Sequence, residues 1–284
     1  MDQWTGEWGE PSHRIDPRVL APENGSPWAI HAPTAWHGPT GLRARMSGAG
    51  RADRYFSSIA RGEETGKSGL LSSTRAPPGF ISIYAGEDLR RHVCGAPDHI
   101  IETARVAKTV YTGPKILFVK TGAGPVACRC DDSLPTLQSV YVVKTTDQHP
   151  EFIDAVVGVL CSAIVTAYCY YEWTSLKLLQ PQFTQGNLGS LPMPEVDTEL
   201  VAALAPRVAR IRADVRALDA AIDPAVVNSL RARMATVERE LDVEVARAFG
   251  LELEDWLDAI TPALNRLPVS QRPRWWARGL RGRG

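Results

Sequence analysis

Apolar residues recur every three or four positions from residue 200 to residue 245, a spacing that places them on one face of a helix. The pattern is interrupted at Asp223, a good N-cap, followed by Pro224, which suits the first position of a helix. The sequence therefore predicts a helical hairpin. Pro206 should either kink the first helix or mark its start, and a short helix is expected at residues 252–260.

Strand-like segments rich in β-branched and aromatic residues precede the hairpin, separated by Gly, Pro and Asp turns. They are residues 80–84, 99–101, 115–120, 126–128 and 139–143. Residues 116–119 and 140–143 are continuous apolar runs, which suit strands buried on both faces, so we expect helices to cover this sheet. The predicted fold class is α+β, a mixed sheet-based domain covered by helices and followed by a helical hairpin.

The uncharged, largely apolar stretch at residues 155–171 has 17 residues and predicts a buried helix, because a membrane span needs about 20 apolar residues. The predicted organisation is an irregular leader at 1–54, an α/β domain at 55–196, the hairpin and short helix at 197–262, and a basic Arg/Trp tail at 263–284. The five cysteines are an odd number, and the chain opens without a signal-peptide pattern. We therefore expect a cytoplasmic protein.

The formal net charge is +0, but it is a sum over segments of opposite sign. Residues 40–130 carry fourteen basic and seven acidic groups, whereas residues 131–265 carry ten basic and twenty acidic groups. The tail from residue 266 has six arginines and no acid. This asymmetry is typical of a protein in which one face binds an anion and the other faces keep the protein soluble. Ordinary solvent-exposed faces would give the same numbers of charged residues.

Three motifs imitate catalytic or ligand sites. Residues 62–68 have three residues between the glycines where a phosphate-binding loop needs four, so an exposed turn is favoured. Residues 122–127 imitate a dinucleotide motif but lead into a second strand, which indicates a hairpin turn. A zinc site built from His92, Cys94, Cys128 and Cys130 lacks the usual spacing, and buried free thiols are favoured. We expect no catalytic residue and no metal.

A series of short motifs follows in order between residues 55 and 260. They are IARGEETG at 59–66, AGEDLRR at 85–91, YTGPKIL at 111–117, VA at 126–127 leading to SVY at 139–141, GVLCS at 158–162, LPMP at 191–194, and FGL at 249–251 followed by Glu254. In this order they resemble the TaqI-like C-terminal specificity domain. That domain is the DNA target-recognition region that follows the methyltransferase in many Type IIG restriction–modification enzymes and related phage-defence methylases. Cys161 stands where that family usually has asparagine.

The resemblance implies a recognition module without its enzyme. The family's N-P-P-Y tetrad, its glycine-rich S-adenosylmethionine loop and a P-D…(D/E)-x-K nuclease pattern are all missing from the sequence. The implied function is a sequence-specific specificity module, non-catalytic by itself, that acts in trans with an adenine-specific DNA methyltransferase. The implied partners are double-stranded DNA and a methyltransferase or restriction subunit, with no membrane. No cofactor is expected here, because S-adenosylmethionine would belong to the partner methyltransferase.

The resemblance and the basic segment together nominate the DNA-binding side chains. Arginine can form two hydrogen bonds to guanine, glutamine can form two to adenine, and lysine neutralises phosphates. The candidates are the cations Lys67, Arg75, Arg90, Arg91, Lys115, Lys120 and Arg129 and the polar side chains of Thr65, Tyr84 and Gln138.

The alternative function is a helical-hairpin protein-interaction subunit, or a remnant of a split methylase, that no longer reads DNA. The hairpin would then be either a docking surface or a structural lid on the sheet. The Arg/Trp tail suits a nucleic-acid backbone, and an unstructured basic end explains it equally well.

Overall fold

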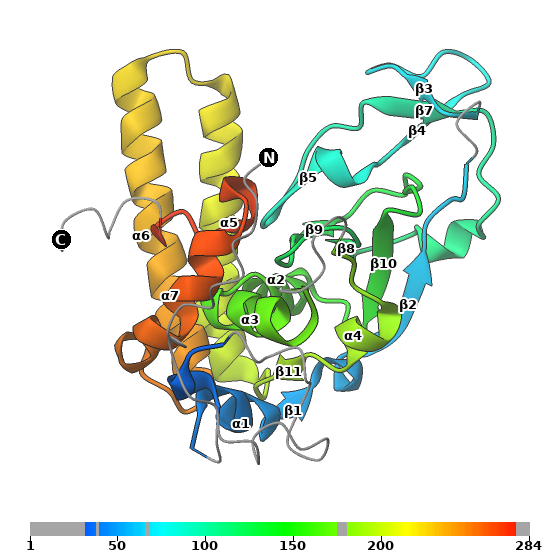
Figure 1. The fold of residues 1–284 in the computed structure, drawn as a ribbon. Coiled ribbons are helices and arrows are strands. Elements are labelled where there is room, and N and C mark those ends of the chain that lie inside the picture. Colours follow the sequence, from blue (N-terminus) through cyan, green and yellow to red (C-terminus); the bar gives the residue numbers. More distant parts are fainter. Residues whose placement is uncertain (1–31, 38–39, 66–68, 175–180, 277–284) are drawn as a thin grey trace, which may run out of the picture.

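The computed structural model describes residues 32–37, 40–65, 69–174 and 181–276, which form the predicted mixed α+β fold. Figure 1 shows a hairpin of two long helices on one side and the strands on the other, with shorter helices between them. We call the described part of residues 56–145 the sheet lobe. The α-helices outside these residues form the helical body.

The central sheet has four antiparallel strands in the order β2-β10-β8-β9. The strands are β2 (Phe56–Arg61), β8 (Lys115–Val119), β9 (Ala127–Cys130) and β10 (Val140–Thr145). The strands expected at 115–120, 126–128 and 139–143 are thus confirmed. β2 adds an edge strand to them.

The two faces of this sheet contact two separate hydrophobic cores. In β8, Ile116 and Phe118 pack into a main core shared with the helices, whereas Leu117 packs into a second core. Neighbouring side chains of a strand point to opposite faces, so a strand buried at every position needs cover on both sides. Helix α2 (Pro150–Leu160) covers one face. The other face is covered by strand and loop residues such as Tyr84 and Leu89, so the expected helical cover is confirmed for one face only.

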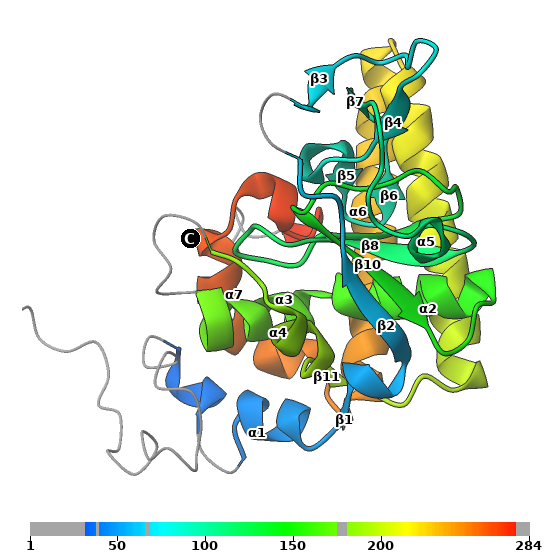
Figure 2. The ribbon, with the colours of Figure 1, turned by 90° about the vertical axis from the view of Figure 1, so that its right-hand side faces the viewer.

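Three smaller sheets complete the strands. The first has the strand order β3-β7-β4 and consists of β3 (Leu71–Ser72), β4 (Ile81–Ile83) and β7 (His99–Ile101). The second pairs β5 (Leu89–Arg90) with β6 (Val93–Cys94). The third pairs β1 (Gly50–Arg51) with β11 (Pro192–Met193). The strands expected at 80–84 and 99–101 are confirmed. Figure 2 shows β3, β4 and β7 stacked above the central sheet.

The apolar stretch 155–171 is buried, as predicted, but it is not one straight helix. α2 is followed by α3 (Ala163–Cys169) and a π-helical turn (Tyr170–Thr174), and the two parts bend by 56° at the break. Ser162 caps α3 by accepting a hydrogen bond from the amide of Val165, at 3.3 Å. No single described helix is long and apolar enough to cross a membrane; only this bent pair, taken together, meets the length and composition of a span.

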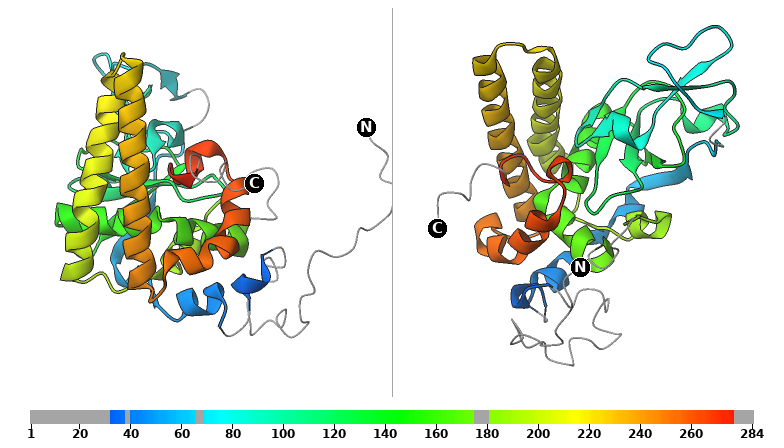
Figure 3. Two further views of the ribbon diagram at one scale, coloured as in Figure 1. Left: turned by 90° about the vertical axis from the view of Figure 1, so that its left-hand side faces the viewer. Right: turned by 45° about the horizontal axis from the view of Figure 1, so that its top comes forward.

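The predicted hairpin is confirmed as α5 (Thr198–Ala220) and α6 (Pro224–Ala248), which run side by side in Figure 3. Asp223 caps α6 by accepting from the amide of Ala225, at 2.8 Å. α5 begins before Pro206, so this proline does not mark its start. The hairpin packs closely on α2, where a Cβ at Gly158 would lie 3.2 Å from a methyl carbon of Val208, so a side chain there would require Val208 to shift.

The segment expected to be an irregular leader contributes to the core where the structure describes it. Helix α1 (Leu42–Ser47) buries Leu42 and Met46, and Trp36 is also buried. The Trp36 ring lies 4.8 Å from that of Tyr171, between ring centroids. The sequence shows no period here because the segment is short and its core contacts are made mainly with distant residues.

The end of the chain also packs on the body, as far as the structure describes it. After α7 (Leu257–Arg266), Trp275 and Trp276 are buried, and the indole N–H groups donate to Asp242 (2.6 Å) and to Asn265 (3.0 Å). Arg274 forms an ion pair with the buried Glu238. The tail side chains that would suit a nucleic-acid backbone are thus engaged internally up to residue 276; residues 277–284 lie outside the described part. The short helix expected at 252–260 is present as a 3-10 turn (Leu253–Trp256) leading into α7.

The carboxyl group of Asp242 predicts a pH dependence of stability. Burial raises its pKa to about 7 from an ordinary 3.8, although bonds from the Ala163 amide and the Trp275 indole oppose this. The folded-state pKa lies above the unfolded value, so the native state binds the extra proton, and the free energy of unfolding falls as the pH rises from about 4 to about 7. Asp242→Asn should remove this pH dependence of the free energy of unfolding. The dependence amounts to a few kcal/mol at most, since a shift of one pKa unit corresponds to about 1.4 kcal/mol.

The measurement is urea unfolding of wild type and Asp242→Asn at pH 4, 5, 6 and 7. As the pH rises, the free energy of unfolding of the wild type should fall relative to that of the variant. The control is Asp255→Asn, which changes an exposed aspartate. Parallel pH profiles for wild type and Asp242→Asn would contradict the prediction.

Candidate nucleic-acid interface

Arg91 joins the sheet lobe to the helical body from a buried position. Its guanidinium donates to the backbone carbonyl of Cys161, to the hydroxyl of Thr166 at 3.3 Å and to the backbone carbonyl of Gln271 at 3.2 Å. Two of the sequence motifs, 85–91 and 158–162, therefore contact each other directly. Arg91 is a structural link, and its side chain does not face solvent.

The turn at residues 122–124 is held by the same C-terminal segment. The side-chain carbonyl of Gln271 accepts hydrogen bonds from the amides of Ala123 (2.9 Å) and Gly124 (3.0 Å). This turn connects the antiparallel strands β8 and β9, which confirms the predicted hairpin turn.

The four residues considered for zinc are divided between two environments. Cys128 and Cys130 lie in the second core with Cys94 packed against it, whereas the ring of His92 lies beside Glu238 on α6, 3.8 Å between Nε2 and Oε1. Burial and the neighbouring arginines lower the pKa of His92. No group of three or more His, Cys, Asp or Glu side chains is arranged to hold a metal ion among the residues that the structure describes.

Glu63 organises the end of β2 through a carboxylate that is only 1% exposed. The carboxylate accepts from the amides of Arg105 (2.7 Å) and Val106 (3.0 Å) and from the hydroxyl of Tyr111 (3.0 Å). Burial, followed by the charge of Glu63, raises the pKa of Tyr111. The backbone carbonyl of Glu63 also accepts from the amide of Gln138 at 2.9 Å. The carboxylate of Glu63 thus fixes the loop of residues 105–111, and its backbone carbonyl fixes the loop at Gln138, against the end of β2.

Four side chains lie around this anchor, and we call them the β2-end surface: Arg61, Thr65, Arg105 and Gln138. Arg61 donates to the side-chain carbonyl of Gln138 at 3.2 Å. Arg61 and Arg105 are exposed, and Thr65 and Gln138 are half-buried. The structure thus brings the two nominated residues Thr65 and Gln138 together with two arginines that the sequence reasoning missed.

Two further nominated cations face solvent. Arg75 is exposed and Lys120 is half-buried, and neither side chain has a hydrogen bond or ion pair with any residue in the described ranges. Lys67 lies outside the described residues. Lys108, which was not nominated, is likewise exposed and unpaired within the described part of the chain.

Two other nominated residues join Arg91 in the interior. The amine of Lys115 donates to the backbone carbonyl of Asp132, and the hydroxyl of Tyr84 donates to the carboxylate of Asp132 at 2.6 Å. Burial, followed by this hydrogen bond, raises the pKa of Tyr84. Reaching a base edge would require these side chains to leave the core, so we do not place them at the interface.

The last two nominated arginines are held in ion pairs. Arg90 forms a two-pronged pair with Asp219 on α5, at 2.9 and 2.6 Å, and this bond lowers the pKa of Asp219. Arg129 donates to Asp154 at 2.8 Å and pairs with Asp131 at 3.0 Å. Both arginines would have to exchange an existing partner for a phosphate or a base.

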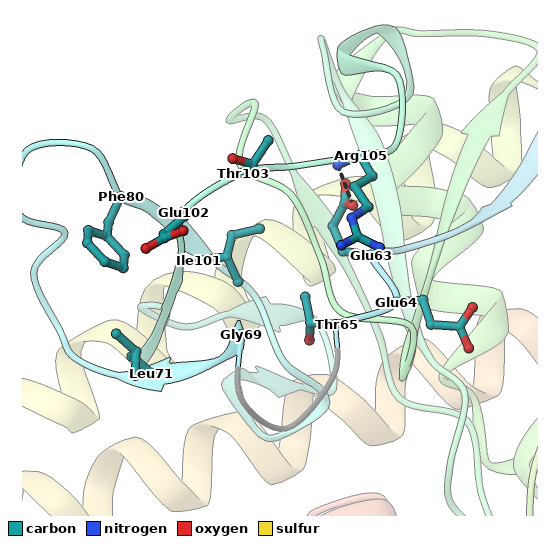
Figure 4. Close-up of a pocket in the computed structure, with 10 residues that line it drawn as sticks. All are labelled: Glu63, Glu64, Thr65, Gly69, Leu71, Phe80, Ile101, Glu102, Thr103 and Arg105. Carbon is teal, nitrogen blue, oxygen red and sulfur yellow. Dashed lines mark hydrogen bonds between the residues drawn. The ribbon is translucent and has the colours of Figure 1, made fainter.

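A pocket of about 290 Å³ opens beside the β2-end surface. Figure 4 shows Phe80, Leu71 and Glu102 at one end and Arg105 at the other, with Thr65 between them. The pocket thus lies between the β3-β7-β4 sheet and the loop that Glu63 anchors.

No protein-family model and no curated protein matches this sequence. Two solved structures share part of the arrangement, and both come from restriction–modification systems. The Type IIL restriction–modification enzyme MmeI, solved in complex with DNA, gives a TM-score of 0.44 and 8% identity over 73% of this chain and 36% of that chain. A type I restriction–modification system, studied for its assembly and conformational transition, gives a TM-score of 0.36 and 15% identity over 70% of this chain and 44% of that chain.

The chain spans less than half the length of either structure. At these scores and identities neither likeness assigns a function, and the resemblance to the TaqI-like domain remains a prediction.

The Glu63 anchor gives a test of this geometry. Glu63→Gln keeps the size of the side chain but removes the charge and one of the two acceptor oxygens. Since a buried donor is then left unpaired, the free energy of unfolding should fall by about 1–3 kcal/mol. Urea unfolding measures the change, with Glu64→Gln, an exposed neighbour, as the matched control. Equal stability of the two variants would show that the carboxylate does not hold the loops.

Proposed function

We propose that this chain is a sequence-specific DNA target-recognition module of a restriction–modification or phage-defence system. It is non-catalytic by itself and acts with a methyltransferase or restriction subunit. S-adenosylmethionine would be bound by that partner.

The β2-end surface is the observation that carries this proposal. It combines two exposed arginines with a glutamine and a threonine, the side-chain types that read base edges. The buried carboxylate of Glu63 holds the backbone of Arg105 and Val106, so this loop does not have to be ordered on binding. Arg75 and Lys120 supply unpaired charge in the same lobe, suited to phosphates.

The charge of the hairpin supports the assignment of the interface to the sheet lobe. Of the eight arginines on α5 and α6, six form ion pairs with acidic side chains. An arginine already paired to a carboxylate gains little from a phosphate, because it must first give up its partner. The free positive charge relevant to DNA is therefore concentrated outside the hairpin.

Salt-dependent binding of a DNA duplex tests the proposal. Four cations (Arg61, Arg75, Arg105 and Lys120) predict a slope of about −3 to −4 when the logarithm of the binding constant is plotted against that of the salt concentration. Fluorescence anisotropy of a labelled duplex measures it. The double variant Arg75→Gln/Lys120→Gln should make the slope shallower by about two.

The matched control is Arg216→Gln/Arg231→Gln, which removes the two hairpin arginines that have no ion pair in the described part of the chain. It should leave the slope unchanged. A slope near zero for the wild type, or no binding up to micromolar duplex, would rule the function out.

One observation favours the alternative, a hairpin that docks a protein partner. Ile222, at the turn between α5 and α6, is 94% exposed, and Val226 on the next turn is 46% exposed. Contact with another protein would remove the apolar surface of these two side chains from water. Such a contact is compatible with DNA reading by the sheet lobe, since the two surfaces lie on different elements.

A further inference from the structure

We propose that the pocket beside the β2-end surface receives one unpaired guanine base of the bound DNA. This inference rests on the proposed DNA-recognition function and names the base that the site takes. The pocket volume of about 290 Å³ is too small for a duplex and lies at the lower end of the range for small-molecule sites.

The apolar end of the pocket suits the flat face of a base. Phe80 is half-buried and Leu71 is 48% exposed, and both line the cavity with the buried Ile101 beneath them. An aromatic ring and aliphatic side chains are the surfaces on which extruded bases stack. A base inserted here would cover apolar surface that is now open to water.

One unpaired donor and one unpaired acceptor face the pocket from opposite ends, the guanidinium of Arg105 and the carboxylate of Glu102. The guanidinium of Arg105 only donates and the carboxylate of Glu102 only accepts. Neither group has a hydrogen bond or ion pair with another side chain among the residues that the structure describes. They lie at opposite ends of the cavity in Figure 4. A ligand that fits must present acceptors on one edge and donors on another.

Guanine has this arrangement. Its O6 and N7 accept on one edge, matching Arg105, and its N1–H and exocyclic amine donate on another, matching Glu102. In adenine the N6 amine and the N7 acceptor share one edge, and thymine has no exocyclic amine. The donor edge of guanine is occupied by cytosine in a duplex, so the base must be unpaired to reach Glu102.

The charge of the lining argues for a base over a phosphate. Glu64 and Glu102 both line the pocket and are exposed, against one arginine, so the lining is net negative. A phosphate would be repelled, whereas the amine of a base is attracted.

Binding of single nucleosides tests this pocket without a duplex. The protein is titrated with guanosine, adenosine, cytidine and thymidine, and binding is measured by calorimetry or saturation-transfer NMR. Guanosine should bind about tenfold more tightly than thymidine, and Arg105→Gln and Glu102→Gln should each weaken guanosine about tenfold. Phe80→Leu should also weaken it, by loss of stacking. The controls Arg231→Gln and Glu195→Gln remove exposed charges elsewhere and should have no effect.

Binding of adenosine, cytidine or thymidine as tight as that of guanosine, or guanosine binding unchanged by both charge variants, overturns the inference. All substituted charges are exposed, and circular dichroism confirms that each variant is folded. Salt-dependent duplex binding without guanosine binding would overturn the guanine pocket and leave the DNA-recognition function standing. Selective guanosine binding without duplex binding would support the pocket and overturn that function.

Discussion

The buried guanidinium of Arg91 ties the sheet lobe to the helical body. It contacts the break between α2 and α3 through Cys161, the α3 helix through Thr166, and the C-terminal segment through Gln271. A buried cation that lost these acceptors would be costly, so the three segments must keep their relative positions. Gln271 also holds the β8–β9 turn, because its side chain accepts hydrogen bonds from two amides of that turn. The orientation of the sheet lobe is thereby fixed from inside the molecule.

The surface proposed to read DNA depends on a second buried charge. Glu63 binds the backbone of residues 105 and 106 and the hydroxyl of Tyr111, so it positions Arg105 without touching the guanidinium. Anchoring the main chain leaves the side chain free for a ligand. Arg61 ends strand β2, and Thr65 and Gln138 lie on the chain segments beside it, so the surface has the defined position that direct readout requires.

Local patterns in the sequence predicted the elements but only half of the surface, its residues Thr65 and Gln138. The hairpin and the strands β8 and β10 follow from apolar spacing, because burial of a periodic face decides them. The nominated Arg91 and Lys115 are buried, since their long side chains reach backbone carbonyls in the interior. Arg105 was missed because its place beside Glu63 depends on a contact between residues 42 positions apart. The leader expected at residues 1–54 likewise contains α1 and β1 where the structure describes it, and the pairing of residues 50–51 with residues 192–193 leaves no local signal.

The most direct test of sequence-specific reading is selection of bound duplexes from a pool with randomised bases. The full chain would be incubated with the pool at physiological salt, and the retained DNA sequenced over successive rounds. We expect enrichment of one short motif, because the β2-end surface presents a fixed set of base-reading side chains. Retained duplexes with the base composition of the starting pool at every position would contradict it.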